Sequence, residues 1–342
     1  MGTTQAMTPT YDTAVVIGRF APFDIHHAER LSRIGDLAKR VVILVCAAEA
    51  APSCRMPWTA AEREAMLRAG IGATDAEIGC VDDHVYLPEA FTAEVIARAA
   101  AQGTVCVVSR PADVRPEALA ALPQVWTRIS VDAPLLDLEG FYGDTAAFDA
   151  WASQVPEMVK TWLEDWRTTP TFTAMAAENR YVGQYLESWK VAPYPVCFVA
   201  VDIFVIHADP SGTPHLLLVR RGGIPGRGQW ALPGGYLEPD ESLLNGALRE
   251  LQEETGMVLS PQVVAASFKG AEVFAEPDRA SRGRVITHAH RFVFEAGPLP
   301  VVEGADDAEH AVWTPLSDLA AMRDCFFEDH YPMIEYLLER EA

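Results

Sequence analysis

The chain contains 342 residues, 49% of them hydrophobic and 22% charged, and its formal net charge is −21. Because a single hydrophobic core stops growing near ~250 to 300 residues, this length predicts two domains of ordinary size. The negative charge argues against non-specific binding to nucleic acid or to an anionic membrane, since both need a basic surface.

The N-terminal segment MGTTQAMTPTYDTAVVIG has neither a basic region nor a long apolar core, so it does not have the pattern of a secretory signal. No stretch of about 18 apolar residues occurs in the chain. The six cysteines form no CxxC pair and have no histidine at zinc-finger spacing, which is typical of buried thiols in a reducing compartment. We therefore expect a cytoplasmic protein.

Apolar runs alternate with helical patterns through the first half. The predicted strands are Ala14–Gly18, Val41–Cys46 and Thr104–Ser109, and the predicted helices are Ala60–Ala69, Ala90–Ala101 and one that begins near His26 or His27. This alternation predicts a parallel sheet with crossover helices, in which ligands bind at the carboxyl ends of the strands.

The segment after the first strand, GRFAPFDIHHAERL, resembles the phosphate-binding entry of the nucleotidyltransferase superfamily. Nicotinamide mononucleotide adenylyltransferases typically have GRFxPFHxGH here, and RMPWTAAEREAMLRAGI is similar to their second recurrent segment. The resemblance implies a Rossmann-like nucleotidyltransferase domain over residues 1–134. It assigns nucleotide binding to Gly18, Arg19, Phe20, His27 and Asp113, although an aspartate beside Pro111 is equally typical of a turn.

This domain departs from the family pattern. Asp24 stands where the family has its first histidine, and His26 stands where it has glycine and is interpreted as a polar cap residue. The closing ISxTxxR-like signature appears as ISVDAPLLDL, which keeps Ser130 but has Asp132 and Pro134 at donor positions and no arginine. One lost donor typically costs ~10²–10³ in rate, so we predict weak or no adenylyltransferase activity. The alternative is an active enzyme in which other arginines compensate, namely Arg19, Arg55, Arg63, Arg110 or Arg115.

Residues 135–192 have the pattern of a helical and aromatic connection. Their aromatic side chains recur at spacings compatible with helix faces, at Trp151, Trp162, Trp166, Tyr181, Tyr185 and Trp189. This pattern favours a core that joins the domains over a base-stacking surface. No repeat or low-complexity linker is visible, so we expect the domains to pack against each other.

The second domain is expected to span residues 193–342 and to open with two strands, Val196–Ile206 and His215–Arg221. The following glycine-rich segment, GGIPGRGQW, has the composition of a mobile loop. In it and just before it stand three candidate substrate contacts, Arg221, Arg227 and Trp230. The alternative interpretation is that Arg220 and Arg221 merely end an edge strand.

The segment GYLEPDESLLNGALRELQEETGM predicts a helix of about three to four turns, with Asp240 as its N-cap and Gly256 just beyond its end. Glu250, Glu253 and Glu254 fall at i, i+3 and i+4 and therefore share one helical face. Like charges at this spacing repel unless a counter-ion lies between them. A hard divalent cation, Mg²⁺ or Mn²⁺, fits such oxygen ligands.

This segment matches the whole pattern Gx5Ex7REUxEExGU and resembles the Nudix hydrolase superfamily. The resemblance implies an α/β/α sandwich that hydrolyses a nucleoside diphosphate linked to another group. Glu250, Glu253 and Glu254 match the glutamates that bind the metals, which activate water and neutralise the pyrophosphate. Arg249 and Glu241 complete the predicted catalytic set and are expected to form an ion pair that fixes the helix to the preceding loop.

A second segment, EVFAEPDRASRGRVITHAHRFVF, is similar to DRDxRGRxISHAY of the ADP-ribose pyrophosphatases that are fused to nicotinamide mononucleotide adenylyltransferases. Its Arg279, Arg282 and Arg284 form a local cation site suited to a pyrophosphate or a ribose phosphate. His288 and His290 alternate along a predicted strand and so share one face, where a structural histidine and a substrate contact are equally good interpretations.

Together these features resemble the bifunctional nicotinamide mononucleotide adenylyltransferase/ADP-ribose pyrophosphatase family, with an α/β fold in both domains. The resemblance implies that the second domain splits ADP-ribose into AMP and ribose 5-phosphate, with a small-molecule nucleotide as its partner and no nucleic acid or membrane. The catalytic base is left open among Glu272, Glu276, Glu303, Asp306 and Asp307.

Three functions are compatible with this resemblance: a hydrolase with a weak adenylyltransferase domain, a fully bifunctional enzyme that also makes NAD, and a ligand-sensing regulator. The intact Nudix pattern and the absence of a basic helix-turn-helix segment after it argue against the regulator. Nudix domains of this kind are often dimeric, so a homodimer is a further expectation.

Overall fold

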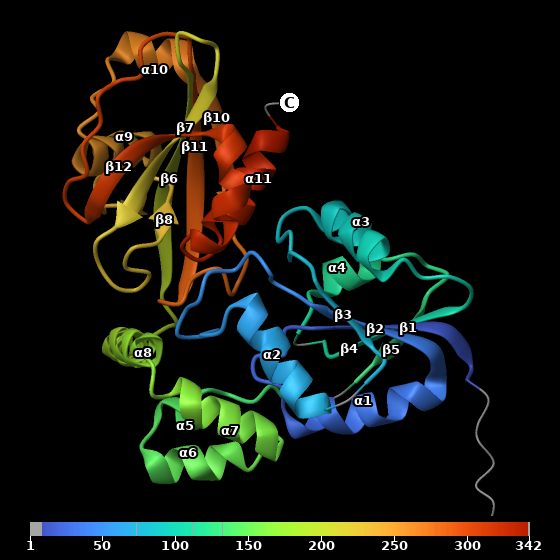
Figure 1. Cartoon of the computed structure of the whole chain (residues 1–342). Helices are drawn as coiled ribbons and strands as arrows, with labels where there is room; N and C mark the ends of the chain where they lie inside the picture. The colour runs from blue at the N-terminus through green and yellow to red at the C-terminus, as the bar shows by residue number, and fades with distance from the viewer. Residues whose placement is uncertain (1–8, 73, 112, 132, 341–342) are drawn as a thin grey trace, which may run out of the picture. The chain divides into compact units, whose positions relative to one another are not determined.

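The computed structural model describes residues 9–72, 74–111, 113–131 and 133–340, and the chain divides into two compact units, Met1–Ala176 and Ala177–Ala342 (Figure 1). The division falls within helix α8 (Pro170–Ser188). Asp132 lies outside the described residues. Among the helices that are described, none is both long enough and apolar enough to cross a membrane.

The first unit contains a parallel sheet, as the alternating pattern predicts. Its strands are β1 (Tyr11–Gly18), β2 (Ala38–Val45), β3 (Glu77–Cys80), β4 (Val105–Ser109) and β5 (Thr127–Ser130), in the spatial order β3-β2-β1-β4-β5. The order changes direction between β1 and β4, and ligands of such sheets bind beyond the strand ends at this point. The sequence pattern did not predict β3 and β5, which are short and only partly buried or exposed.

Helices cover both faces of this sheet. They are α1 (Ile25–Leu37), α2 (Ala60–Ile71), α3 (Pro88–Ala99) and α4 (Pro116–Ala121). Ala14 and Val16 of β1 belong to a core cluster with residues of α1 and α2, whereas Val15 and Ile17 belong to a cluster with residues of α3 and α4. Because successive residues of a strand face opposite sides, β1 is buried on both.

Three further helices, α5 (Glu139–Tyr142), α6 (Thr145–Ala152) and α7 (Glu157–Trp166), extend the core of the first unit. The ring of Phe141 packs edge-on against Trp58, and Trp166 also contacts Trp58. In the second unit, by contrast, Trp189 of the short 3₁₀ turn η1 (Trp189–Val191) contacts Phe198. The aromatic side chains of residues 135–192 are therefore divided between the two units.

The second unit contains a mixed sheet. Its strands are β6 (Cys197–Ala208), β7 (Pro214–Arg221), β8 (Trp230–Ala231), β9 (Gly234–Tyr236), β10 (Phe268–Phe274), β11 (Arg284–Phe294) and β12 (Ala308–Pro315). The main path runs β10-β11-β6-β7-β12, and β8 and β9 pair with β7 and β6. Strands β6 and β11 are parallel, whereas the other pairs are antiparallel.

Helices lie on both faces of this sheet, as an α/β/α sandwich requires. The helical elements after β9 are α9 (Leu243–Thr255), α10 (Pro261–Ser267), the 3₁₀ segment η2 (Leu316–Cys325) and α11 (His330–Glu339). On α9, Ala247 and Leu251 pack with Phe292 of β11. On α11, the ring of Tyr336 contacts Phe274, which pairs with Thr287. Positions 287 and 292 of β11 face opposite sides, so α9 and α11 cover different faces.

Helix α9 ends as predicted but begins later than predicted. Gly256 ends it in the left-handed conformation, with φ of 71°, which suits a residue without a Cβ. The predicted N-cap Asp240 is wrong, because the hydroxyl of Ser242 accepts the hydrogen bond from the Asn245 backbone N–H. Asp240 lies in the turn before the helix.

Candidate functional site

The three metal-binding candidates of the Nudix pattern line one cavity of the second unit. They come from the last turns of α9, where Glu250 and Glu254 are only 8% and 6% exposed and Glu253 is more open to solvent. Gly235 of β9 allows this arrangement, since a Cβ there would collide with the Glu250 carboxylate. The glycine of the pattern therefore makes room for a carboxylate.

Arg249 holds these carboxylates in place. Its guanidinium donates to Glu241 at 2.7 and 3.1 Å, which confirms the predicted ion pair. Its Nη1 also donates to Glu250 Oε1 at 2.9 Å and to Glu253 Oε2 at 2.8 Å. Nη2 further reaches the Tyr236 carbonyl oxygen, so one arginine joins the helix, the preceding loop and β9.

Burial disfavours the ionised form of two of these carboxylates, Glu250 and Glu254. Burial raises the pKa of Glu254 to about 8, although its Oε2 accepts a hydrogen bond from the Gly234 N–H at 2.9 Å. Burial also raises the pKa of Glu250. Carboxylates on one helix face whose ionised form is disfavoured within the protein fit a hard divalent cation, which would stabilise that form.

Arginines contribute to the lining of the same cavity. The guanidinium of Arg221 lies 4.1 Å from the centre of the Phe327 ring, and that of Arg282 lies 5.1 Å from the centre of the Tyr236 ring. Arg279 donates to both oxygens of Asp329, at 3.0 and 2.9 Å. The cavity therefore combines an acidic group of residues with fixed cations that suit an anionic ligand.

The other predicted substrate contacts have different surroundings. Trp230, Arg284 and His288 are not among the described residues that line the cavity. Arg284 instead donates to the Ala275 carbonyl oxygen at 2.7 Å. His290, which shares a face of β11 with His288, is 3% exposed and its Nδ1 lies 3.0 Å from the His288 carbonyl oxygen. Burial lowers the pKa of His290.

Among the candidate bases, Asp306 and Asp307 line the cavity, while Glu272, Glu276 and Glu303 are absent from its described lining. Asp306 has a φ of 52°, a conformation that few residues other than glycine adopt.

Sequence reasoning missed three carboxylates of this cavity, Asp202, Glu238 and Glu328. Asp202 had a signal, since it interrupts an otherwise apolar strand pattern. It is 6% exposed, Thr287 donates to it at 2.6 Å, and its burial raises its pKa. No sequence signal marks Glu328, because it stands among other acidic residues in a loop.

Four nucleotide-binding candidates of the first unit gather beyond β1 and β4, where the strand order changes direction. Gly18 ends β1, and a Cβ on it would lie 3.2 Å from Phe20 and 3.4 Å from Asp113. The Phe20 ring is 5.0 Å from that of His27. His27 Nε2 lies 3.4 Å from Asp113 Oδ2. The fifth candidate, Arg19, instead pairs with Asp83 at 3.0 Å.

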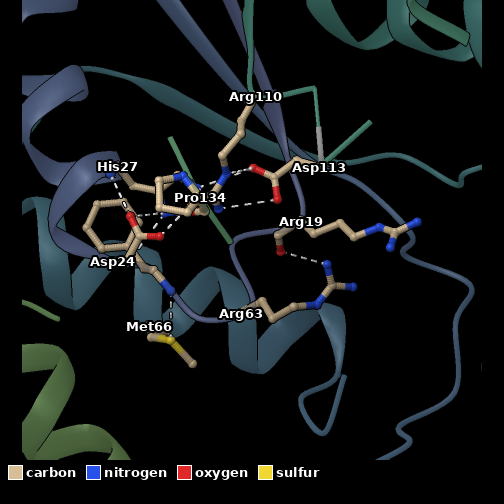
Figure 2. Close-up of polar contacts among 9 residues, drawn as sticks. Arg19, Asp24, His27, Arg63, Met66, Arg110, Asp113 and Pro134 are labelled. Atoms are coloured by element: carbon tan, nitrogen blue, oxygen red, sulfur yellow. Dashed lines mark hydrogen bonds and ion pairs between the residues drawn. The ribbon is translucent and has the colours of Figure 1, made fainter. Parts of the chain in front are cut away.

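Asp24, His27, Arg110 and Asp113 form a closed cluster there, hereafter the Asp24 cluster (Figure 2). Arg110 donates to Asp24 and to Asp113, both at 2.9 Å, and also to the Pro134 carbonyl oxygen. Its Nη2 lies 3.0 Å from His27 Nε2. All four side chains are at most 5% exposed.

Within this cluster, each charge has a partner. Burial alone would raise the pKa of Asp24, but its hydrogen bonds and the charges of His27 and Arg110 hold that pKa well below the usual range. Burial likewise opposes protonation of His27, yet its hydrogen bonds to the Asp113 and Asp24 carboxylates, together with their charges, outweigh burial and raise the His27 pKa. Asp24 also caps α1 by accepting from the His27 N–H, whereas His26, the predicted cap residue, is exposed.

The other arginines that could replace the missing arginine of the first unit lie outside the Asp24 cluster. Arg63 is fully buried and donates to the carbonyl oxygens of Arg19, Cys46 and Ala47, so it fastens the loops after β1 and β2 (Figure 2). Arg115 donates to the Val85 carbonyl oxygen at 3.3 Å, and Arg55 is exposed.

Comparison with known proteins identifies a NUDIX domain over residues 198–337. An ADP-ribose pyrophosphatase of Methanocaldococcus jannaschii is 36% identical over 134 residues, which cover 39% of this chain and 70% of that protein. An ADPR responsive transcriptional repressor NtrR of Acinetobacter baylyi is 28% identical over 169 residues, which are 48% of this chain and 61% of the repressor.

Solved structures resemble the chain along its whole length. A bifunctional NMN adenylyltransferase/ADP ribose pyrophosphatase from Francisella tularensis is 30% identical with a TM-score of 0.85, covering 97% of this chain and 100% of that one. The same enzyme complexed with AMP and a manganese ion is 29% identical with a TM-score of 0.84, over the same coverage.

Proposed function

Since the chain belongs to the bifunctional NMN adenylyltransferase/Nudix ADP-ribose pyrophosphatase family, we propose that its second unit hydrolyses the pyrophosphate of ADP-ribose. The products are AMP and ribose 5-phosphate. The observation that carries this proposal is one cavity lined both by the glutamates of the Nudix pattern and by Arg221, Arg279 and Arg282. Carboxylates can bind a divalent metal and arginines can bind a pyrophosphate, so the cavity offers binding groups for both the metal and the substrate.

Glu250, Glu253 and Glu254 would hold Mg²⁺ or Mn²⁺, and the related enzyme that carries AMP and manganese supports a metal of this class. The bound metal would activate water and neutralise charge on the pyrophosphate. Arg249 keeps Glu250 and Glu253 oriented through its hydrogen bonds, and Glu241 in turn fixes Arg249. This second layer of contacts sets the geometry of the metal ligands.

Asp306 is the residue we favour as the general base. It lines the cavity, and its charge contributes, after burial and the charge of Glu253, to the raised pKa of Glu250. A carboxylate within electrostatic range of the metal ligands can accept a proton from the attacking water. The oxygen of that water then joins one phosphorus atom, and the bridging oxygen leaves with the other phosphate.

Arg221 and Arg282 are suited to bind the pyrophosphate. Each lies against an aromatic ring, and Arg221 is buried enough that its pKa is lowered. A cation held in position and partly freed of water interacts strongly with an anion. Arg279 is less available, because Asp329 already occupies its guanidinium, so it contributes mainly to the shape of the site.

The first unit is expected to be a weak adenylyltransferase or none. The Asp24 cluster occupies the position where the family binds the triphosphate, and Arg110 and His27 there already neutralise Asp24 and Asp113. Asp24 also takes the place of a family histidine that could donate to a nucleoside triphosphate. The second candidate function, a fully bifunctional enzyme, is favoured by the similarity of the whole chain to the Francisella protein.

Product analysis by liquid chromatography tests both halves of the proposal. The full chain is incubated with Mg²⁺ and ADP-ribose, and separately with Mg²⁺, ATP and nicotinamide mononucleotide. We expect AMP from the first reaction and no NAD above background from the second. Robust NAD formation would establish the bifunctional enzyme, and the absence of AMP would contradict the hydrolase.

A further inference from the structure

Glu328 is a carboxylate among the arginines of the Nudix cavity. It precedes α11 in the chain and lines the cavity together with Arg221 and Arg282. Its charge interacts with that of each of these arginines. A negative charge beside the arginines that would bind a pyrophosphate weakens that binding. Binding of an anion therefore does not explain why Glu328 stands there.

The position of Glu328 is fixed by Ser281. One carboxylate oxygen, Oε1, accepts hydrogen bonds from the Ser281 backbone N–H at 2.6 Å and from its hydroxyl at 2.8 Å. The backbone of Glu328 has a φ of 46°, which is uncommon for residues other than glycine. Such conformations persist where the surrounding structure holds them, and they are concentrated at functional sites.

The second oxygen, Oε2, remains available. Within the described part of the chain, the hydrogen bonds of Glu328 are the two that Oε1 accepts from Ser281. Neither neighbouring arginine forms an ion pair with it there, because Arg282 lies over Tyr236 and Arg221 lies over Phe327. Glu328 therefore places a hydrogen-bond acceptor, Oε2, in a fixed position beside the proposed pyrophosphate site.

We infer that Glu328 Oε2 accepts a hydrogen bond from a ribose hydroxyl of the nucleotide substrate, and so selects ribose over deoxyribose. This inference rests on the proposed function of the same cavity. A carboxylate accepts hydrogen bonds only, and the hydroxyls of the two riboses are the neutral donors nearest to the pyrophosphate of ADP-ribose. Both riboses offer the same chemistry, so either could be the partner.

A site built to bind a hydroxyl rejects the analogue that lacks it, because its buried acceptor is then left unpaired. A hydrogen bond to a charged group is stronger than one between neutral groups, so removing this hydroxyl should weaken binding by about 10- to 100-fold. The tie between Glu328 and Ser281 could by itself serve only to connect two loops. In that case the presence of a hydroxyl on the ligand would make no difference.

Binding of three ligands to the full chain tests the inference. Calorimetry in Ca²⁺ compares ADP-ribose with its 2′-deoxy form, altered in the adenosine ribose, and its 2″-deoxy form, altered in the terminal ribose. Each is titrated into the wild type, Glu328→Gln and Glu328→Ala. The Gln variant keeps an oxygen for Ser281 and so preserves the loop contact. Glu309→Gln, an exposed carboxylate outside the cavity, is the matched control.

We expect one deoxy form to bind the wild type and the control about 10- to 100-fold more weakly than ADP-ribose, and this ratio to fall near one in both Glu328 variants. The form that is penalised identifies the ribose. Equal binding of the three ligands to the wild type, or an undiminished ratio in the variants, would overturn the inference while leaving the hydrolase intact. Failure of the wild type to bind or cleave ADP-ribose at all would overturn both.

Discussion

Two groups of charged side chains, one in each unit, both join carboxylates to an arginine but differ in their balance of charge. In the Nudix pattern, three glutamates share Arg249, and burial raises the pKa of a fourth, Glu254, to about 8. In the Asp24 cluster, two aspartates are matched by Arg110 and by His27, and the pKa values of Asp24 and Asp113 are lowered.

The direction of these pKa shifts distinguishes an open site, which can still bind a cation, from a closed one, whose charges are already paired within the protein. A carboxylate whose pKa is raised by burial gains from an added cation, whereas one with a lowered pKa already has partners that outweigh its burial. The comparison therefore predicts that the second unit gains from a metal, while the first unit is stabilised by its own network.

The largest expected effect concerns the uncompensated group. Glu253→Gln or Glu254→Gln removes a proposed metal ligand while leaving a side chain of the same size, so AMP release from ADP-ribose should fall by at least about 10²–10³-fold. Initial rates over a range of Mg²⁺ concentrations measure this, with Glu309→Gln as the control and circular dichroism to verify the fold. Full turnover by either variant would mean that the catalytic residues lie elsewhere.

The Asp24 cluster can be opened by a substitution. Asp24→His restores the family's residue and removes the charge that holds Arg110, so NAD formation from ATP and nicotinamide mononucleotide should rise by about 10- to 100-fold. Asp24→Asn keeps an oxygen that can cap α1 but adds no cation, so its gain should be smaller. The proposal fails if the wild type already makes NAD rapidly and neither substitution improves it.

The carboxylates of the two groups should also respond oppositely to pH. The lowered pKa of Asp24 and Asp113 stabilises the fold above the ordinary value of 3.8, and this contribution is lost as the pH falls through their folded values. His27, whose pKa is raised, stabilises below 6.5, and its contribution is lost as the pH rises through its folded value. Without metal, Glu254 destabilises progressively from pH 4.5 to about 8.

Melting temperatures of the wild type and of His27→Asn, measured across pH, test whether the stabilisation by His27 is lost as the pH rises. The difference between the two proteins should be greatest between about pH 4 and 6.5 and should shrink in more alkaline solution. A difference that grows as the pH rises would show that His27 is neutral in the folded protein. Added Mg²⁺ should leave this difference unchanged, because the metal is expected to bind in the other unit.

Local patterns were the part of both sites that the sequence could predict. Glu250, Glu253 and Glu254 share a face because they lie within five residues of one helix, and the Glu241 pair spans only eight residues. The Arg110 contact with Asp24 spans 86 residues, and that of Arg279 with Asp329 spans 50, so no local pattern indicates them. Among the three arginines of the second segment, strand geometry and these distant partners decide which ones reach the cavity.

The smallest expected effect is that of the α9 cap, and the Asp24 cluster, which also includes a helix cap, provides the contrast. Ser242 caps α9 without touching the metal-binding glutamates, so Ser242→Ala should lower the free energy of unfolding by about 1 kcal/mol, and Asp240→Ala by less. Asp24 both caps α1 and holds Arg110, so Asp24→Ala removes the cap together with one of the two carboxylates that neutralise this buried cation, and should cost about 3–5 kcal/mol. Urea denaturation measures all three. Equal losses for Ser242→Ala and Asp24→Ala would mean that the Asp24 cluster contributes little beyond its cap, and would remove the physical basis for contrasting a closed site with an open one.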